Sequence, residues 1–318
     1  MPKITVIMNC LNGEKLIRNA IESVYAQTFQ DWEIIFWDNA STDATAAIAK
    51  SFDDGRLRYF RSEKTVPLGQ ARQWAIAEAR GEWLTLLDYD DAFMPQFFEK
   101  HMAAIGDGDY TLSYSGYRDV DDNDNLLRNV MPQNKSGYLL PSLLMHYDIN
   151  TATVMMQRKC LEEFTRGRTS SFVGAEDYFL YLSLAARGEV CVVPEILATY
   201  RVASSSWTER ALDLHSSEYH QTLDQLERDL PGITERHREA FAFARARAEY
   251  AQAKYLMHVG RYAEARKIMA SIRHFRRAFA GLHMVSYIPP LWALIHRRTI
   301  KSRLTGLVMG RSNSRKPA

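Results

Sequence analysis

The segment Trp83–Pro95, WLTLLDYDDAFMP, decides how the fold is interpreted, because an apolar run ends abruptly in three carboxylates within four positions. The run WLTLLD is typical of a buried β-strand. Asp88, Asp90 and Asp91 repel one another and raise one another's pKa unless a cation or hydrogen-bond donors offset their charge. A polar turn would explain the same pattern, so the choice depends on which other polar groups converge there.

Upstream of this segment, short apolar runs alternate with stretches of helical periodicity. We predict strands at 4–8, 32–38, 56–60 and 83–88, and helices at 16–25, 41–52 and 69–80. Ser41 or Thr42 would cap the second helix, and Gly81 would stop the third. Strict alternation of this kind indicates an α/β fold with a Rossmann-like, mostly parallel sheet flanked by helices.

Polar residues follow three of these strands, at 9–14, 38–43 and 88–91. The carboxyl ends of parallel strands meet at one edge of a sheet, and ligands bind outside that edge. Crowding so many acidic and amide groups there is costly unless a cation or a donor-rich ligand offsets the repulsion. The sequence therefore predicts a ligand site at this edge.

The chain beyond residue 104 has a different pattern. Residues 110–131 read as a hairpin around an Asp/Asn-rich turn, which lacks the Gly and the final Glu of a calcium loop. A helix begins near Glu176, and a strand runs through Val193 to Arg201. From Leu212 the chain is helical, and 246–269 resembles one tetratricopeptide hairpin turned at Gly260. One unit cannot form a solenoid, so packing against the rest of the chain is favoured over partner recruitment.

Composition indicates a globular protein. The 318 residues are 46% apolar, no run approaches the roughly 20 apolar residues of a membrane-spanning helix, and the N-terminus lacks signal-peptide features. These features favour a cytoplasmic location. The three cysteines show no C-x-x-C spacing, which argues against a disulfide framework or a zinc site.

Charge is unevenly distributed along the chain. From Ala265 onward there are twelve Lys and Arg residues and no Asp or Glu, so the rest carries −10 within a total of +2. A basic tail favours an anionic partner, either lipid or nucleic acid. Its apolar segment, broken by Pro289 and Pro290, favours a membrane surface with Tyr287 and Trp292 at headgroup depth. A terminal helix docked on the core is the alternative.

Taken in order, TVIMNCLNGEKLIRNAIESVYAQTFQDWEIIFWDNASTDAT, GQARQWAIAEARGEWLTLLDYDDAFMP, GAEDYFLYLSLAARG and TYRVASSS resemble an inverting glycosyltransferase of family 2 with the A-type nucleotide-sugar transferase fold. The resemblance covers about two thirds of the chain. It implies a catalytic domain at 1–206, with a nucleotide-binding half at 1–104 and an acceptor half at 105–206. A helical extension at 207–280 and a basic amphipathic tail at 281–318 follow.

The resemblance assigns a role to each polar cluster. Asp90 of the D-x-D motif would bind a divalent Mn or Mg ion, Asp88 would hold ribose or metal-bound water, and Asp91 would support the loop. The nucleotide base, ribose and phosphate would be bound by residues from the first two clusters and the preceding helix, namely Asn9, Leu11, Asn12, Glu14, Asp38 and Arg72.

The ED pair Glu176–Asp177 matches the general-base motif of the family. Asp177 would take the proton of the acceptor, and its place in the first turn of a helix would keep it ionised. Helix capping is the alternative role for the pair. Asp148, Asn150 and Thr151 are candidates for contacts to sugar hydroxyls, although no pattern defines the specificity.

Several positions depart from the family pattern. Asn9 to Asn12, NCLN, stands where relatives have Pro-Thr-Tyr-Asn, which removes an aromatic contact and leaves uracil less strongly indicated. A His expected near Val202 is absent, and Arg201 with 204–206 would have to compensate.

The sequence thus predicts a metal-dependent inverting glycosyltransferase that moves a sugar, with UDP-sugar the favoured donor, to a glycan or lipid-linked acceptor in cell-surface polysaccharide synthesis. It would act at the inner face of the membrane through its basic tail, without nucleic acid. The alternative is a non-catalytic nucleotide-sugar-binding or scaffold protein that uses the helical region. A nucleotidyltransferase is disfavoured, because Asn12–Gly13 is not a glycine-rich phosphate loop.

Overall fold

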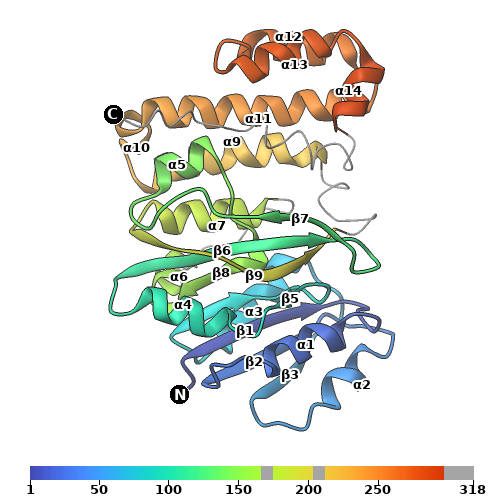
Figure 1. Cartoon of the computed structure of the whole chain (residues 1–318), viewed down its shortest axis with the longest axis vertical. Coiled ribbons are helices and arrows are strands. Elements are labelled where there is room, and N and C mark those ends of the chain that lie inside the picture. Colours follow the sequence, from blue (N-terminus) through green and yellow to red (C-terminus); the bar gives the residue numbers. More distant parts are fainter. Residues whose placement is uncertain (166–174, 203–211, 297–318) are drawn as a thin grey trace, which may run out of the picture. The chain divides into compact units, whose positions relative to one another are not determined.

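The computed structural model describes residues 1–165, 175–202 and 212–296 (Figure 1). The chain divides into two compact units. The first comprises Met1–Leu143 and Tyr147–Ser206, and the second comprises Leu144–His146 and Trp207–Ala318.

The first unit is built on a sheet whose N-terminal half is entirely parallel. Its neighbouring strands in spatial order are β3 (Leu57–Arg61), β2 (Trp32–Asp38), β1 (Ile4–Cys10) and β4 (Trp83–Leu86). All four strands were predicted, and β2 has the predicted bounds. Because these strands run the same way, the residues that follow β1, β2 and β4 gather at one edge.

The other half of the sheet is mixed. The order continues from β4 through β8 (Val154–Gln157), β6 (Tyr110–Val120) and β9 (Glu189–Arg201) to β5 (Ala92–Phe93), with β7 (Leu126–Val130) paired to β6. The β6–β7 pairing is the predicted hairpin. The β6–β9 pair is parallel, whereas β8 runs antiparallel to both of its neighbours.

Helices supply the apolar cover of the sheet. Ile4, Val6 and Met8, alternate residues of β1, share one core with α1 (Ile17–Tyr25) and α4 (Phe97–Ile105). In a strand such residues lie on the same face. Contacts of α3 (Leu68–Ala77) with β1 and β2 are made through buried alanines. The remaining helical segments of this unit are α2 (Thr45–Lys50), α5 (Leu140–Met145), the short 3-10 helix Thr151–Thr153, α6 (Arg158–Thr165) and α7 (Glu176–Ala185).

The predicted start of the second helix is wrong. Helix α2 begins at Thr45 and its N-cap is Ala44, and the Asp43 carboxylate accepts from the Thr45 N–H at 3.0 Å. The side chains expected to cap it are used elsewhere: the Ser41 hydroxyl accepts a hydrogen bond from the Asn12 N–H at 3.0 Å. Residues 41–43 therefore belong to a loop that contacts the loop after β1.

The second unit is helical in its described residues. The predicted hairpin is formed by α11 (Arg238–His258) and α12 (Tyr262–Ile272), and Gly260 between them has a φ of +80°, which glycine adopts without strain. The other helices are α9 (Leu212–Asp229), α10 (Ile233–Arg236), α13 (Arg277–Val285) and α14 (Pro289–His296). None of the described helices is long and apolar enough to cross a membrane.

The segment Leu144–His146 belongs to the helical unit although it lies far away in sequence. Met145 packs against the apolar cluster of that unit, and the Leu144 carbonyl accepts a hydrogen bond from Arg247 at 3.3 Å. The helical unit is thus assembled from two parts of the chain.

Trp292 does not lie at a surface, contrary to the prediction that it would sit at headgroup depth. It is buried in the apolar cluster of the helical unit, with its ring 6.3 Å from that of Tyr250. The docked terminal helix, stated as the alternative, is therefore what α14 forms. Of the predicted basic tail, residues 297–318 lie outside the described residues.

Gly81 lies where β1 and the segment before β4 come close together. A Cβ atom at this position would lie 2.5 Å from the backbone nitrogen of Thr5. We expect Gly81→Ala to lower the free energy of unfolding by about 1–3 kcal/mol through overpacking. Gly55→Ala is the matched control, because a Cβ there meets nothing within 4 Å. Urea-induced unfolding of both variants measures the difference, and equal midpoints would contradict the close approach.

Candidate active site

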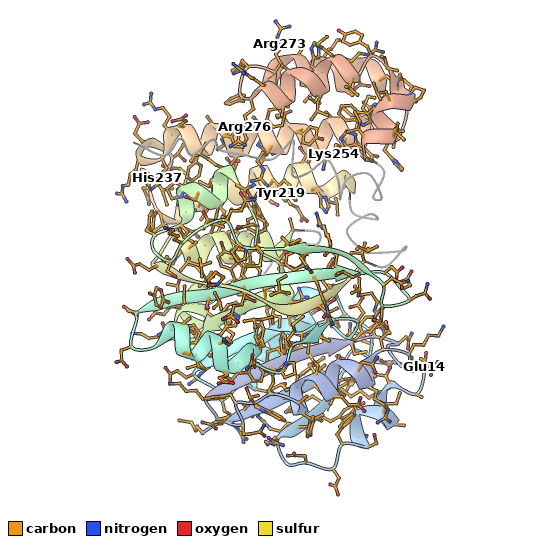
Figure 2. All side chains as sticks on the ribbon, viewed as in Figure 1. Glu14, Tyr219, His237, Lys254, Arg273 and Arg276 are labelled. Carbon is orange, nitrogen blue, oxygen red and sulfur yellow. The ribbon has the colours of Figure 1, made fainter. Side chains whose placement is uncertain are left out.

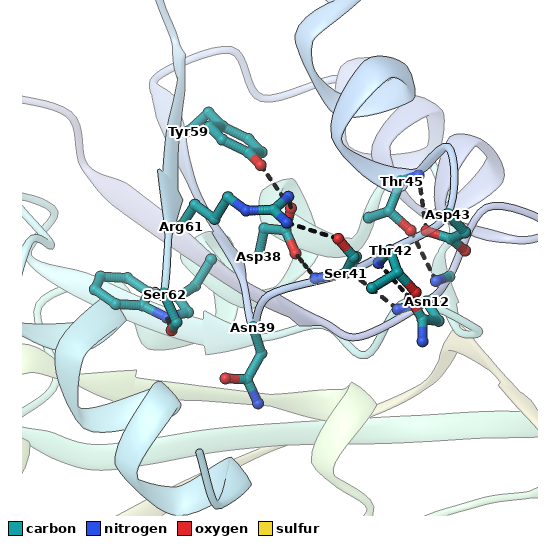
Figure 3. A network of polar contacts seen from close by, with 12 residues as sticks. Asn12, Asp38, Asn39, Ser41, Thr42, Asp43, Thr45, Tyr59, Arg61 and Ser62 are labelled. Atoms are coloured by element: carbon teal, nitrogen blue, oxygen red, sulfur yellow. Dashed lines mark hydrogen bonds and ion pairs between the residues drawn. The ribbon is translucent and has the colours of Figure 1, made fainter. Parts of the chain in front are cut away.

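The loop after β1 and the loop after β2 satisfy each other's backbone groups. Asn12 accepts from the Thr42 N–H at 2.8 Å through its side-chain oxygen, and the Glu14 carboxylate accepts from the Ala44 N–H at 3.0 Å. In return, Asp43 accepts from the Glu14 N–H at 3.0 Å. Figure 3 shows part of this network, in which Asn12 faces Ser41 to Thr45. The two predicted clusters therefore meet.

Asp38, at the end of β2, is fully buried yet well supplied with donors. Its carboxylate accepts from the Ser41 N–H at 2.7 Å, the Tyr59 hydroxyl at 2.6 Å and Arg61 at 2.7 Å (Figure 3). A carboxylate has about four acceptor positions, so these three bonds occupy most of them. Tyr59 and Arg61 were not among the predicted site residues.

The loop after β1 also contacts the acidic motif. A Cβ on Gly13 would lie 2.4 Å from the Cys10 sulfur and 2.9 Å from the Tyr89 ring, so only glycine fits between them. Burial raises the pKa of the Cys10 thiol to about 12, which keeps it a neutral packing group. The three polar clusters thus form one continuous set of contacts.

Arg72 joins the acidic motif to the ED pair. Its guanidinium lies 2.9 Å from an Asp88 oxygen and 3.9 Å from a Glu176 oxygen. Burial acts to lower the pKa of Arg72, but the charges of Asp88 and Glu176 outweigh it and the pKa is raised. Gly69, in the first turn of α3, allows the Glu176 carboxylate to come close to this helix, because a Cβ at position 69 would lie 2.9 Å from Glu176.

Asp177 lies beside Glu176 in the first turn of α7, as predicted. Its carboxylate accepts from the Tyr178 N–H at 2.8 Å and contacts the Thr151 hydroxyl at 3.5 Å. Burial raises the pKa of Asp177, with a smaller contribution from Asp88, while the Tyr178 N–H and Arg72 oppose the shift. One oxygen of the Asp177 carboxylate thus accepts a hydrogen bond from a backbone N–H in the first turn of α7. Helix capping and a general-base role are therefore compatible for this pair.

Arg201, at the end of β9, holds the acidic motif from the other side. Its backbone N–H donates to the Asp91 carboxylate at 2.9 Å, and its guanidinium donates to the Asp90 carbonyl at 3.3 Å. The same guanidinium bonds the Asp121 carbonyl at 2.8 Å and the Asp124 carboxylate at 2.5 Å, both in the β6–β7 turn. The supporting role predicted for Asp91 and Arg201 is consistent with these contacts.

The carboxylates of the motif are strained electrostatically. Burial, followed by the charge of Asp88, raises the pKa of Asp90 to about 6. Burial and the charges of Asp88 and Asp90 raise the pKa of Asp91 well above its usual range. The backbone N–H of Asp90 itself and the charge of Arg201 oppose this rise in the pKa of Asp90 without cancelling it.

These carboxylates fit a divalent cation that is shared with a ligand. In the described part of the chain, no group of three or more His, Cys, Asp or Glu side chains could hold a metal alone. Mg²⁺ is usually bound through one or two carboxylates together with substrate phosphates, and Mn²⁺ favours the same oxygen ligands. Asp90 with Asp88 supplies such a set, and a cation would relieve the repulsion that raises the pKa of Asp90.

The remaining predicted nucleotide-binding residues also lie at or just after the end of β1, at the carboxyl edge of the sheet, but they differ in how exposed their side chains are. Asn9 is buried at the end of β1, and its side-chain nitrogen has no hydrogen-bond partner in the described structure. Leu11, Asn12 and Glu14 are exposed. Arg61 stands opposite Asp38 in the parallel β2–β3 register, and no signal in the sequence alone gives this pairing.

Known proteins with similar sequences are glycosyltransferases. The family model described as Glycosyl transferase family 2 matches residues 5–164, half of the chain. The Escherichia coli UDP-Glc:alpha-D-GlcNAc-diphosphoundecaprenol beta-1,3-glucosyltransferase WfgD is 29% identical over 205 residues, covering 64% of this chain and 78% of that protein.

Two solved structures share the fold. S. aureus TarS 1–349 has a TM-score of 0.62 at 15% identity, covering 96% of this chain and 92% of that chain. The mannosyltransferase PcManGT from Pyrobaculum calidifontis, in complex with GDP-Man and Mn²⁺, has a TM-score of 0.61 at 17% identity, covering 92% and 86%. At such identities the likeness concerns the fold alone.

Replacing Asp90 by Asn should stabilise the protein when divalent ions are chelated. Because its pKa is raised from 3.8 to about 6, the folded state binds more protons than the unfolded state between those values, so stability falls as pH rises through them. The gain is about 1–3 kcal/mol near pH 8 and vanishes below about pH 4.

Thermal unfolding in EDTA at several pH values measures this gain. Asp31→Asn is the control, since Asp31 is exposed and precedes β2 at the opposite end of the strand. A lower midpoint for Asp90→Asn near pH 8 would show that the carboxylate is stabilised where it lies.

Proposed function

The chain belongs to glycosyl transferase family 2, and from this premise we propose that it is a metal-dependent, inverting hexosyltransferase that uses a nucleotide-diphosphate sugar. The proposed acceptor is a glycan or lipid-linked saccharide in the synthesis of cell-surface polysaccharide. Its A-type fold is shared with TarS 1–349 and with the mannosyltransferase PcManGT.

One observation carries the proposal: a single guanidinium contacts both chemical motifs. Arg72 lies within 4 Å of Asp88 in the D-x-D motif and of Glu176, the neighbour of the proposed base. Residues 88 and 176 come from distant parts of the sequence. Donor-binding and base functions would therefore operate at one place, as a transfer reaction requires.

The nature of the donor is supported by the relatives. WfgD is named for a UDP-Glc donor and a diphosphoundecaprenol-linked acceptor, and TarS has been solved with UDP-GlcNAc, at a TM-score of 0.58. PcManGT, by contrast, was solved with GDP-Man. We propose a UDP-sugar, with the base held by Asn9, Leu11, Asn12 and Glu14 near Asp38.

Asp90, with Asp88, would hold a Mn or Mg ion, and the PcManGT complex contains Mn²⁺. When bound, such an ion supplies positive charge that stabilises the departing nucleoside diphosphate. Arg72, which is positioned by Asp88 and Glu176, adds a fixed positive charge beside the same motif. Asp91 and Arg201 would keep the loop in place.

The transfer itself is a single displacement. The acceptor oxygen forms a bond to the anomeric carbon from the face opposite the diphosphate, while the bond to the diphosphate oxygen breaks and takes its electron pair. Asp177 accepts the proton of the acceptor hydroxyl. Its raised pKa makes it a stronger base than an ordinary Asp. Glu176 would keep Arg72 oriented beside it.

We propose that residues 1–206 carry out this chemistry, with 207–280 as a helical extension. The acceptor links the reaction to a membrane, so we propose a cytoplasmic protein that associates peripherally with the inner face of the membrane. The basic residues of 281–318 would meet anionic lipid there.

Asp177→Asn should lower the rate of sugar transfer by about 100- to 10,000-fold, because the variant cannot accept the acceptor's proton. Donor binding should change little, since Asn preserves the shape of the side chain. Release of nucleoside diphosphate in the presence of acceptor measures the rate, with Asp31→Asn as the control. Unchanged turnover would remove Asp177 from the mechanism, and binding without turnover in the wild type would favour the scaffold alternative.

Nucleotide sugars should stabilise the protein only when Mn or Mg is present. At a ligand concentration of about 100 times Kd, the expected gain is about 2.7 kcal/mol. A thermal-shift screen of UDP- and GDP-sugars, with Mn or with EDTA, identifies the donor. Asp90→Ala should lose the Mn-dependent part of the shift, whereas Asp31→Asn should keep it. A full shift in EDTA would contradict metal-dependent donor binding.

A further inference from the structure

The turn between α13 and α14 exposes an unusual number of large apolar side chains. Met284 is 73% exposed, Ile288 53% and Leu294 44%, and Tyr287 and Leu291 are also exposed. Residues 278–296 contain no Asp, Glu, Lys or Arg. We call the five side chains Met284, Tyr287, Ile288, Leu291 and Leu294 the apolar corner.

The apolar corner belongs to folded structure rather than to a loose end. Trp292 and Leu282, on the same two helices, are buried in the apolar cluster of the helical unit. The Ser286 hydroxyl donates to the His283 carbonyl at 2.6 Å and closes the turn between the helices. The opposite side of these helices is thus anchored, and the exposed side chains are held outward.

One arginine contacts the apolar corner, and several others stand close to it in the sequence. The Arg266 guanidinium lies 5.1 Å from the centre of the Tyr287 ring. Arg273 and Arg276, both labelled in Figure 2, precede α13, and Arg277 begins it. The sequence continues after His296 with Arg297 and Arg298 and has no acidic residue after Glu264.

The combination of exposed apolar side chains with arginines distinguishes between the partners that could cover the apolar corner. A second copy in a two-fold contact would bring the same arginines against each other, and residues 265–296 contain no Asp or Glu to pair with them. Nucleic acid would satisfy the charges but offers little to exposed Met, Ile and Leu side chains. An anionic bilayer satisfies both, because aliphatic side chains enter the acyl boundary while arginines meet the headgroups.

We propose that the apolar corner inserts into the surface of an anionic lipid bilayer and anchors the helical unit there. The basic tail alone would only adsorb to such a surface. The inference rests on the proposed lipid-linked acceptor for its biological setting, but the binding itself requires no transferase activity.

Flotation of the full-length protein with vesicles of phosphatidylcholine, with or without phosphatidylglycerol, tests the proposal. We expect binding only when phosphatidylglycerol is present. Ile288→Ser/Leu294→Ser should weaken it at least about tenfold, because two aliphatic side chains no longer enter the bilayer. The matched control is Leu126→Ser/Leu127→Ser, since these leucines of β7 are 59% and 44% exposed. It should bind like the wild type.

A second double variant tests whether the arginines contribute to membrane binding beside the inserted apolar side chains. Arg273→Glu/Arg277→Glu should also weaken binding to phosphatidylglycerol vesicles. The proposal is overturned if the wild type does not float, if the serine variant floats like the wild type, or if charge reversal has no effect. A dimer in vesicle-free solution that the serine variant dissociates would assign the corner to self-association instead. The Mn-dependent thermal shift caused by the nucleotide sugar measures the transferase site of each variant separately. Failure of membrane binding therefore leaves the transferase proposal testable, and the reverse also holds.

Discussion

The repulsion among carboxylates at the end of β4 is the constraint on which the site depends. Asp88, Asp90 and Asp91 are tolerated because Arg72 neutralises the first and Arg201 donates to the loop at the other two. The two arginines come from different elements, one from α3 and the other from β9. At Asp90, burial and the charge of Asp88 outweigh the opposing charge of Arg201, so the pKa of this carboxyl stays raised.

The arrangement explains why separate loops keep a defined geometry. The loops after β1 and β2 exchange hydrogen bonds, so each supplies a backbone donor to a carboxylate of the other. Glycine at positions 13 and 69 allows side chains from other elements to approach closely. The site is therefore defined by contacts between loops together with strand residues such as Asp38 and Arg201.

Local signals predicted the local structure well. β-Branched and aromatic runs identified β1 to β4, and polar residues after them identified the edge where ligands bind. Pairing between distant segments left no such signal, so the antiparallel position of β8 and the Arg201–Asp124 contact were not predicted. Ser41 was expected to cap α2 because its own helix was the only partner visible in sequence. Trp292 was misplaced for a related reason: periodicity marks an apolar side chain but not whether protein or lipid covers it.

Because the segment Leu144–His146 belongs to the helical unit, the two units are not consecutive in the sequence. The chain enters the helical unit briefly through α5, returns to the sheet, and completes the helices only after residue 207. Because Met145 supplies part of the helical core, neither unit is a contiguous cassette. Genetic exchange of the helical extension between relatives would therefore have to preserve a complementary turn at the end of α5, which restricts the recombination by which this architecture can diversify.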